Sequence, residues 1–128
     1  MNLEIQLPAL VTILAVLFTF LASARVGALR VKHKVEAPAT VGHPEFERAI
    51  RVHMNTIESL VLFLPLLWLA SLLYSSLLAP ALGGIWLIGR VIYMFGYMSE
   101  AAKRGPGAII TMLATAGLLI LAVIGLVG

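Results

Sequence analysis

The sequence predicts an all-α integral membrane protein in which four transmembrane helices form a bundle. Of its 128 residues, 61% are hydrophobic and only 12% are charged, against roughly 25% charged in soluble domains. Four apolar runs follow one another, and a helix needs roughly 20 apolar residues to cross about 30 Å of hydrocarbon. The runs lack the alternation of barrel strands, so helices are expected. Residues 1–128 are therefore predicted to form a single four-helix transmembrane domain.

The first predicted span covers residues 7–29. Pro8 lies near its beginning, where proline is tolerated because the first amides of a helix have no intrahelical partner. No basic residue precedes this run and a second apolar run follows it, so we expect a retained span rather than a signal peptide. Arg25 and Arg30 mark its exit from the membrane. The polar residues and prolines of 31–45 then predict the one substantial loop.

The next three spans follow from the same pattern. Residues 44–73 predict one long helix, polar and amphipathic over its first half and apolar from Ser59 onward. Residues 74–81 carry no charge and predict a tight turn at the far membrane face. The third span covers 80–98 and contains Arg90. Gly105-Pro106-Gly107 predicts a break after that helix, and the charge-free residues 108–127 form the fourth span.

The lysines and arginines predict the orientation in the membrane. Six of the nine lie between residues 25 and 51, two are at 103 and 104, and the ninth is Arg90. Cytoplasmic loops are enriched in these residues. We therefore expect the first and third loops in the cytoplasm and both termini on the opposite side, in a bacterial inner membrane. The net charge of +3 suits a protein beside a lipid bilayer, and no nucleic-acid partner is expected.

The second span carries a polar stripe at its predicted cytoplasmic end. Arg51, Asn55 and Glu58 are spaced i, i+4 and i+7, which places them on one helix face. Arg48 precedes Arg51 by three residues and lies on the same side. Glu47 precedes Arg51 by four residues, the spacing of an ordinary helix-surface ion pair.

The third span carries a matching stripe, because Arg90, Tyr93 and Tyr97 are spaced i, i+3 and i+7. Glu58 and Arg90 lie at or within apolar runs, so each must be paired or must face a wet cavity. A polar pocket shared by the two helices satisfies both. The alternative is that such side chains are interfacial anchors, and we prefer that account for three residues taken singly: Arg48, Tyr74 and Lys103.

Several kinds of site are excluded or disfavoured. The chain has no cysteine, so it can form neither disulfides nor a cysteine nucleophile. Its three histidines lack metal-ligand spacing, and Ser23 and Ser99 have no evident histidine and aspartate partners. We therefore expect no metal site and no hydrolytic triad. Gly89 and Gly96 are interpreted as close-packing positions of the third helix.

The chemistry of the predicted pocket suits a zwitterionic, multiply carboxylated ligand. Arginines bind carboxylates through forked hydrogen bonds, and Glu58 can accept a hydrogen bond from an ammonium group. Without cysteine, any sulfur chemistry must use a thiol of the ligand. Arg104, together with a tyrosine hydroxyl, can stabilise such a thiol as its thiolate.

Three segments together resemble one known family. Residues 44–58 read PEFERAIRVHMNTIE and closely resemble the signature of the membrane-associated proteins in eicosanoid and glutathione metabolism (MAPEG). This family includes microsomal glutathione transferases, leukotriene C synthase and prostaglandin E synthase. Residues 23–25, SAR, resemble the end of the family's first helix, and residues 90–97, RVIYMFGY, resemble its third-helix motif. The resemblance covers nearly the whole chain.

The resemblance implies a homotrimer with glutathione bound between neighbouring subunits near the cytoplasmic side. It also implies that Arg25 reaches in from the adjacent subunit, and that Arg104 and Tyr97 are catalytic by stabilising the glutathione thiolate. His53 departs from leukotriene C synthase, which has glutamine there. The residues expected to bind glutathione are Arg25, Arg48, Arg51, His53, Asn55, Glu58, Tyr93 and Tyr97.

The sequence thus predicts a membrane-bound glutathione transferase or peroxidase that acts on a hydrophobic small-molecule electrophile or lipid hydroperoxide. Two alternatives belong to other functional classes. A noncatalytic lipid-binding protein of the same fold is possible because the family includes one. A small multidrug exporter is less favoured, because it requires a membrane-embedded carboxylate, whereas Glu4 precedes the first span and Glu58 lies within a basic cluster.

Overall fold

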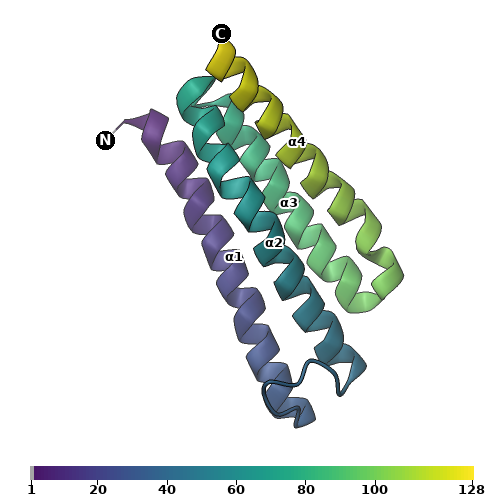
Figure 1. The fold of residues 1–128 in the computed structure, drawn as a ribbon. Coiled ribbons are helices and arrows are strands. Elements are labelled where there is room, and N and C mark those ends of the chain that lie inside the picture. The colour runs from purple at the N-terminus through teal and green to yellow at the C-terminus, as the bar shows by residue number, and fades with distance from the viewer. Residues whose placement is uncertain (1) are drawn as a thin grey trace.

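The computed structural model describes residues 2–128, which form four long α-helices (Figure 1). The helices are α1 (Leu3–His33), α2 (Pro44–Leu73), α3 (Leu78–Ser99) and α4 (Gly105–Val127), and a short 3₁₀ helix, η1 (Ala101–Arg104), lies between α3 and α4. Each of the four long helices is long and apolar enough to cross a membrane. The predicted fold class, an all-α bundle of four transmembrane helices, is confirmed.

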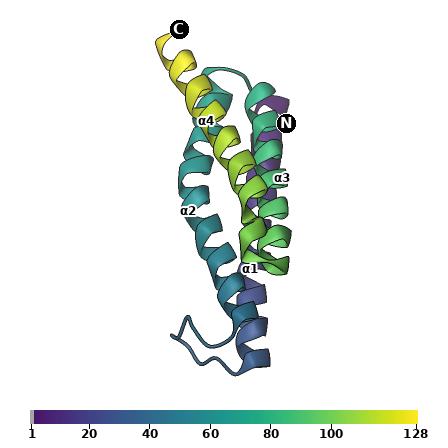
Figure 2. The same ribbon diagram turned by 90° about the vertical axis from the view of Figure 1, so that its right-hand side faces the viewer.

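Successive helices run in opposite directions, so both termini lie at one end of the bundle (Figures 1 and 2). The other end, here called the loop end, carries the α1–α2 loop and η1. α1 and α2 have 31 and 30 residues. At about 1.5 Å per residue, helices of this length span about 45 Å, against about 30 Å of hydrocarbon. They project past α3 and α4 at the loop end (Figure 1), so their polar turns can lie outside the hydrocarbon.

α1 extends beyond the predicted residues 7–29 at both ends. Asn2 caps its beginning, because the Asn2 side chain accepts a hydrogen bond of 3.1 Å from the backbone N–H of Glu4. At its other end the backbone N–H of Lys34 bonds to carbonyls of the last turn, and Lys34 adopts a left-handed conformation with φ of 53°. The predicted loop 31–45 is thereby shortened to residues 34–43.

Two predicted connections are also shorter than expected. Ser75 Oγ accepts hydrogen bonds from the backbone N–H groups of Leu77 and Leu78, so α3 begins at Leu78 and the turn predicted over 74–81 ends before it. The break predicted after the third helix is present, but Gly105-Pro106-Gly107 is not part of it, because α4 begins at Gly105. Pro106 lies in the first turn of α4, where a missing N–H leaves no hydrogen bond unmade.

The core of the bundle is centred on the stacked rings of Phe63 and Trp86, whose centroids are 4.1 Å apart. Both side chains are fully buried among leucines and alanines of all four helices. The indole N–H of Trp86 donates to Ser59 Oγ at 3.0 Å, so the ring brings no unsatisfied donor into the apolar interior. Large apolar side chains on the outer faces, such as Phe20 and Leu113, are exposed, as is suitable for contact with lipid.

α3 and α4 approach closely near the loop end, where Gly107 faces the backbone of Tyr93. A Cβ atom at Gly107 would overlap the backbone N and Cα of Tyr93. Since neither helix backbone can move aside locally, only glycine allows this separation. The contact fixes where α4 begins relative to Tyr93.

Gly107→Ala is therefore expected to separate α4 from α3 and to destabilise the bundle by about 1–3 kcal/mol, the usual cost of overpacking. Thermal unfolding in detergent measures the effect. Gly105→Ala is the matched control, because a Cβ atom at Gly105 meets nothing within 4 Å. Equal stability of the two variants would contradict the account.

Candidate functional site

A buried arginine lies at the base of the site. Arg90 of α3 is 1% exposed, and its guanidinium donates to three side chains. Nη1 donates to Asn55 Oδ1 at 2.8 Å and to Thr56 Oγ1 at 3.4 Å, both on α2, and Nε donates to Thr111 Oγ1 of α4 at 3.3 Å. A charge inside an apolar bundle must be hydrogen-bonded in this way to be tolerated. Arg90 thus connects α2, α3 and α4.

Two tyrosine rings lie in a row between two arginines, from Arg90 toward the loop end. The Arg90 guanidinium carbon lies 4.4 Å from the ring centroid of Tyr93, and the Tyr93 and Tyr97 centroids are 5.6 Å apart. The guanidinium carbon of Arg104, in η1, lies 5.8 Å from the Tyr97 ring centroid. These separations are within the range of cation–π and tilted aromatic contacts. The spacing predicted for α3 therefore produces a continuous column that ends at Arg104.

A cavity of about 640 Å³, here called the polar pocket, opens beside this column. Six of its lining residues are ones singled out from the sequence: Arg51, Asn55, Glu58, Tyr93, Tyr97 and Arg104. Within residues 2–128, Arg51 and Glu58 form no ion pair and no side-chain hydrogen bond. Their charges are therefore available to a ligand.

An apolar groove of about 490 Å³ adjoins the polar pocket between α2 and α4. The two cavities share Asn55 and Glu58 as lining residues. The remainder of the groove is largely apolar and includes Leu62, Met112 and Leu119. A hydrophobic molecule in the groove would therefore lie next to a polar molecule in the pocket.

Three predicted site residues do not line the polar pocket. Arg48 lies on a smaller adjoining hollow of about 210 Å³, which also includes Arg51 and Tyr97. Arg25 is on α1. His53 is two residues from Arg51 and so points to a different side of α2, and its Nδ1 is buried without a hydrogen-bond partner among the described residues. One chain therefore gathers only part of the predicted set.

The structure adds residues that the sequence did not indicate. Thr40 and Val41, in the α1–α2 loop, line the polar pocket together with Glu47. The carboxylate of Glu47 accepts a hydrogen bond of 3.1 Å from the backbone N–H of Gly42. It therefore holds the loop, and no ion pair between Glu47 and Arg51 is present in the described chain. A threonine and a valine in a loop carry no pattern that would have revealed their place.

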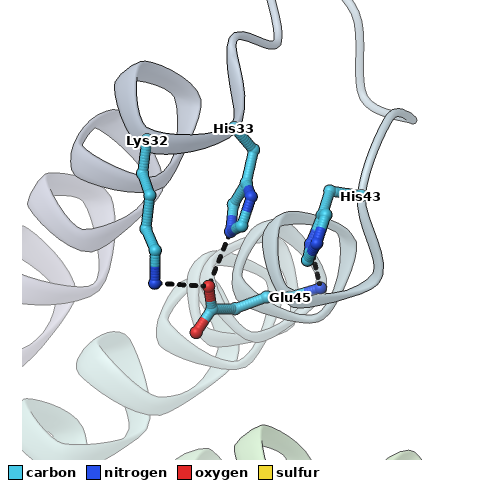
Figure 3. A network of polar contacts seen from close by, with 4 residues as sticks. All are labelled: Lys32, His33, His43 and Glu45. Atoms are coloured by element: carbon cyan, nitrogen blue, oxygen red, sulfur yellow. Dashed lines mark hydrogen bonds and ion pairs between the residues drawn. The ribbon is translucent and has the colours of Figure 1, made fainter.

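A cluster of polar contacts ties this loop to both helices (Figure 3). Glu45 Oε1 accepts from Lys32 Nζ at 3.3 Å and from His33 Nε2 at 2.6 Å. The His33 and His43 rings stack with centroids 3.5 Å apart, and His43 Nδ1 accepts from the backbone N–H of Glu45, capping α2. Among residues 2–128, no three His, Cys, Asp or Glu side chains form a group that could hold a metal ion.

The chain is similar to one protein family and to several known proteins over most of its length. The model of the MAPEG family matches residues 8–124. The chain is 36% identical to human microsomal glutathione S-transferase 2 over 102 residues, or 73% of this chain and 69% of that protein. It is 39% identical to leukotriene C4 synthase of Cavia porcellus over 101 residues, or 79% and 67%. An uncharacterized protein of Synechocystis sp. is 43% identical over 104 residues, or 81% and 76%. The matched residues 8–124 include every residue of the polar pocket.

Replacing Arg90 by Met is expected to destabilise the bundle by about 1–3 kcal/mol, because Asn55, Thr56 and Thr111 lose a shared buried donor. Thermal unfolding in detergent measures this loss. Lys34→Met, which removes a charge from an exposed position of the loop, serves as the control. An Arg90→Met protein as stable as this control would show that the buried hydrogen bonds do not hold the helices together.

Proposed function

The chain belongs to the MAPEG family of membrane proteins, and from this membership we propose that it is a membrane-bound glutathione transferase or peroxidase. The bound glutathione thiolate would react with a lipophilic electrophile or a lipid hydroperoxide. One observation carries the proposal: a cavity of about 640 Å³ is lined by Arg51 and Glu58, which have no ion-pair partner within residues 2–128, and by the Tyr97–Arg104 pair. The relatives named above as a glutathione S-transferase and a leukotriene C4 synthase support it.

The polar groups of the pocket complement those of glutathione, which has two carboxylates, one ammonium group and peptide amides. Arg51 would bind a carboxylate through a forked hydrogen bond, and Glu58 would accept from the ammonium group. Asn55 Oδ1 already accepts from Arg90, so its amide N–H groups are left to donate to a peptide carbonyl. The pocket thus offers a cation, an anion and an amide donor to the carboxylate, the ammonium group and the peptide carbonyl of glutathione.

Arg104 and Tyr97 would act on the sulfur. A cation beside a thiol stabilises the thiolate, which is the nucleophilic form. The thiol proton passes to solvent, and the thiolate sulfur gives an electron pair to an electrophilic carbon, forming a C–S bond while the leaving group departs with its bonding electrons. With a hydroperoxide, the sulfur attacks oxygen and the O–O bond breaks. The alkoxide takes up a proton, and a second glutathione then converts the sulfenic acid to disulfide and water.

The apolar groove would hold the acceptor. It shares Asn55 and Glu58 with the polar pocket and is otherwise lined mainly by side chains of α2 and α4 that suit a lipophilic molecule. A molecule dissolved in the bilayer could enter it without passing through water. The same groove also favours the second candidate function, that of a noncatalytic lipid-binding protein, which would bind lipid without turnover.

We further propose a homotrimer in which neighbouring chains complete each other's pockets. Arg25 and His53 do not line the polar pocket of their own chain. In the trimer, both side chains would face the pocket of the adjacent subunit and contact the glutathione bound there. The loop end would face the cytoplasm of a bacterial inner membrane, because it carries the cationic loops.

Wild-type protein in detergent is expected to bind glutathione as thiolate, seen in the ultraviolet absorbance, and to conjugate a chloronitrobenzene. Arg104→Gln should raise the pKa of the bound thiol by about one unit or more while leaving the affinity for protonated glutathione, measured at low pH, nearly unchanged. Arg51→Gln should weaken glutathione binding by roughly 10- to 100-fold, the loss of a charged hydrogen-bonded contact.

Lys103→Gln is the matched control for these variants, since it removes a neighbouring exposed charge. No glutathione binding at millimolar concentration would overturn the proposed function. Glutathione binding without thiolate formation or conjugation, together with co-purified lipid, would favour the noncatalytic alternative.

Subunit sharing is tested by mixing two inactive variants. Arg25→Ala and Arg51→Ala are each expected to lose most activity as pure trimers. In mixed trimers, the intact Arg51 of one chain can meet the intact Arg25 of its neighbour, so co-expression of the two variants should restore part of the conjugating activity. Absence of restoration, with mixed assembly verified by two different affinity tags, would place both arginines in the site of a single chain or exclude Arg25 from it.

A further inference from the structure

The connection between α3 and α4 folds back onto the last turns of α3. A Cβ atom at Gly96 would overlap the backbone carbonyl oxygen of Lys103 and would lie 3.2 Å from its carbonyl carbon. This obstacle is main chain, so it cannot rotate away as a flexible side chain would. The carbonyl carbon of Lys103 is bonded directly to the backbone nitrogen of Arg104. Any displacement of Lys103 is therefore passed to Arg104.

Local hydrogen bonds hold the rest of this connection close to Gly96. The backbone N–H of Glu100 and the hydroxyl of Ser99 both donate to the carbonyl of Gly96, each at 3.0 Å. The Arg104 guanidinium donates to the Ala101 carbonyl at 2.9 Å. η1 is therefore placed by the surface of α3 at Gly96, and the guanidinium is placed by η1.

We propose that Gly96 is a positioning residue for Arg104. By lacking a side chain, it lets the backbone at Lys103 pack against α3 and sets the distance from the Arg104 guanidinium to the Tyr97 ring. The proposal rests on the proposed function, in which Arg104 stabilises the thiolate. Gly96 touches neither glutathione nor the acceptor in this account and acts only through Arg104.

The alternative is that Gly96 only allows close helix packing, as the glycine spacing of α3 indicated. The partner of Gly96 is decisive here, because it is the backbone of η1 and not a side chain of α4. Gly84, on the same helix, faces open space, and a Cβ atom added there would meet nothing within 4 Å. Alanine is favoured over glycine in helices, so Gly96→Ala and Gly84→Ala differ chiefly in what the added methyl group contacts.

An outward shift of Arg104 should change the pKa of the bound thiol more than it changes the binding of the peptide part of glutathione. The attraction between a cation and a thiolate falls as their separation grows, whereas the peptide would be held mainly by Arg51, Asn55 and Glu58. Gly96→Ala is therefore expected to raise the pKa of the bound glutathione thiol by about one unit, with about tenfold less thiolate at pH values well below the wild-type pKa. At pH values well below the pKa of the bound thiol, where glutathione binds as the thiol, its dissociation constant should change by less than about threefold.

The test compares Gly96→Ala with Gly84→Ala as purified full-length protein, with thiolate absorbance measured against pH at saturating glutathione. Both substitutions are repeated in the Arg104→Gln background. If Gly96 acts through Arg104, its effect on the thiol pKa disappears there. Ala101→Gly loosens the same connection without adding an atom and is expected to raise the thiol pKa as well.

Hydrogen–deuterium exchange of residues 100–105 supplies a readout that needs no glutathione, and it should be faster in Gly96→Ala than in Gly84→Ala. An unchanged thiol pKa in Gly96→Ala, or an equal rise in the Arg104→Gln background, would overturn the proposal. If the wild-type protein forms no thiolate, the proposed chemistry fails. In that case, unchanged hydrogen–deuterium exchange of residues 100–105 in Gly96→Ala would also overturn the positioning of η1 by Gly96, and faster exchange would support it.

Discussion

The guanidinium of Arg90 is the constraint on which the arrangement of the helices depends. It is almost fully buried, and an uncompensated charge there would be strongly destabilising. Its bonds to Asn55, Thr56 and Thr111 therefore hold α2 and α4 in one position relative to α3. The polar pocket and the apolar groove are both partly defined by that position. Thr56 and Thr111 also donate to backbone carbonyls of their own helices, so each bridging oxygen both donates and accepts.

At its polar end, α2 lines the polar pocket with one face and packs against α1 with another. One face carries Arg51, Asn55 and Glu58 toward the polar pocket, while another packs Phe46 and Ala49 against α1 in a separate small core. A helix that projects beyond the hydrocarbon can present polar side chains on several faces without burying them in lipid. The extra length of α2 at the loop end provides this freedom.

The sequence was sufficient to predict the four helices, the two polar stripes and the family, because these depend on apolar length, helical periodicity and side-chain type. It was not sufficient for features that depend on how close two backbones come. Gly107 of α4 packs directly against the backbone of Tyr93, and Thr40 and Val41 line the pocket in a loop that Glu47 of α2 holds at Gly42. Glycine–glycine spacing indicated packing at Gly96 but could not identify Lys103 as the partner.

The two arginines at the ends of the aromatic column differ in what they can do. The guanidinium of Arg90 has three acceptors on two other helices, and moving it would disturb the bundle. Arg104 is exposed, and its guanidinium bonds only to the Ala101 carbonyl of its own short helix among the described residues. It is therefore positioned by η1 and not by the other helices, and its displacement would leave the bundle intact. A charge bonded to two other helices in the interior is suited to structure, and an exposed charge beside the polar pocket is suited to chemistry. Our proposal therefore gives the thiolate to Arg104 and the architecture to Arg90.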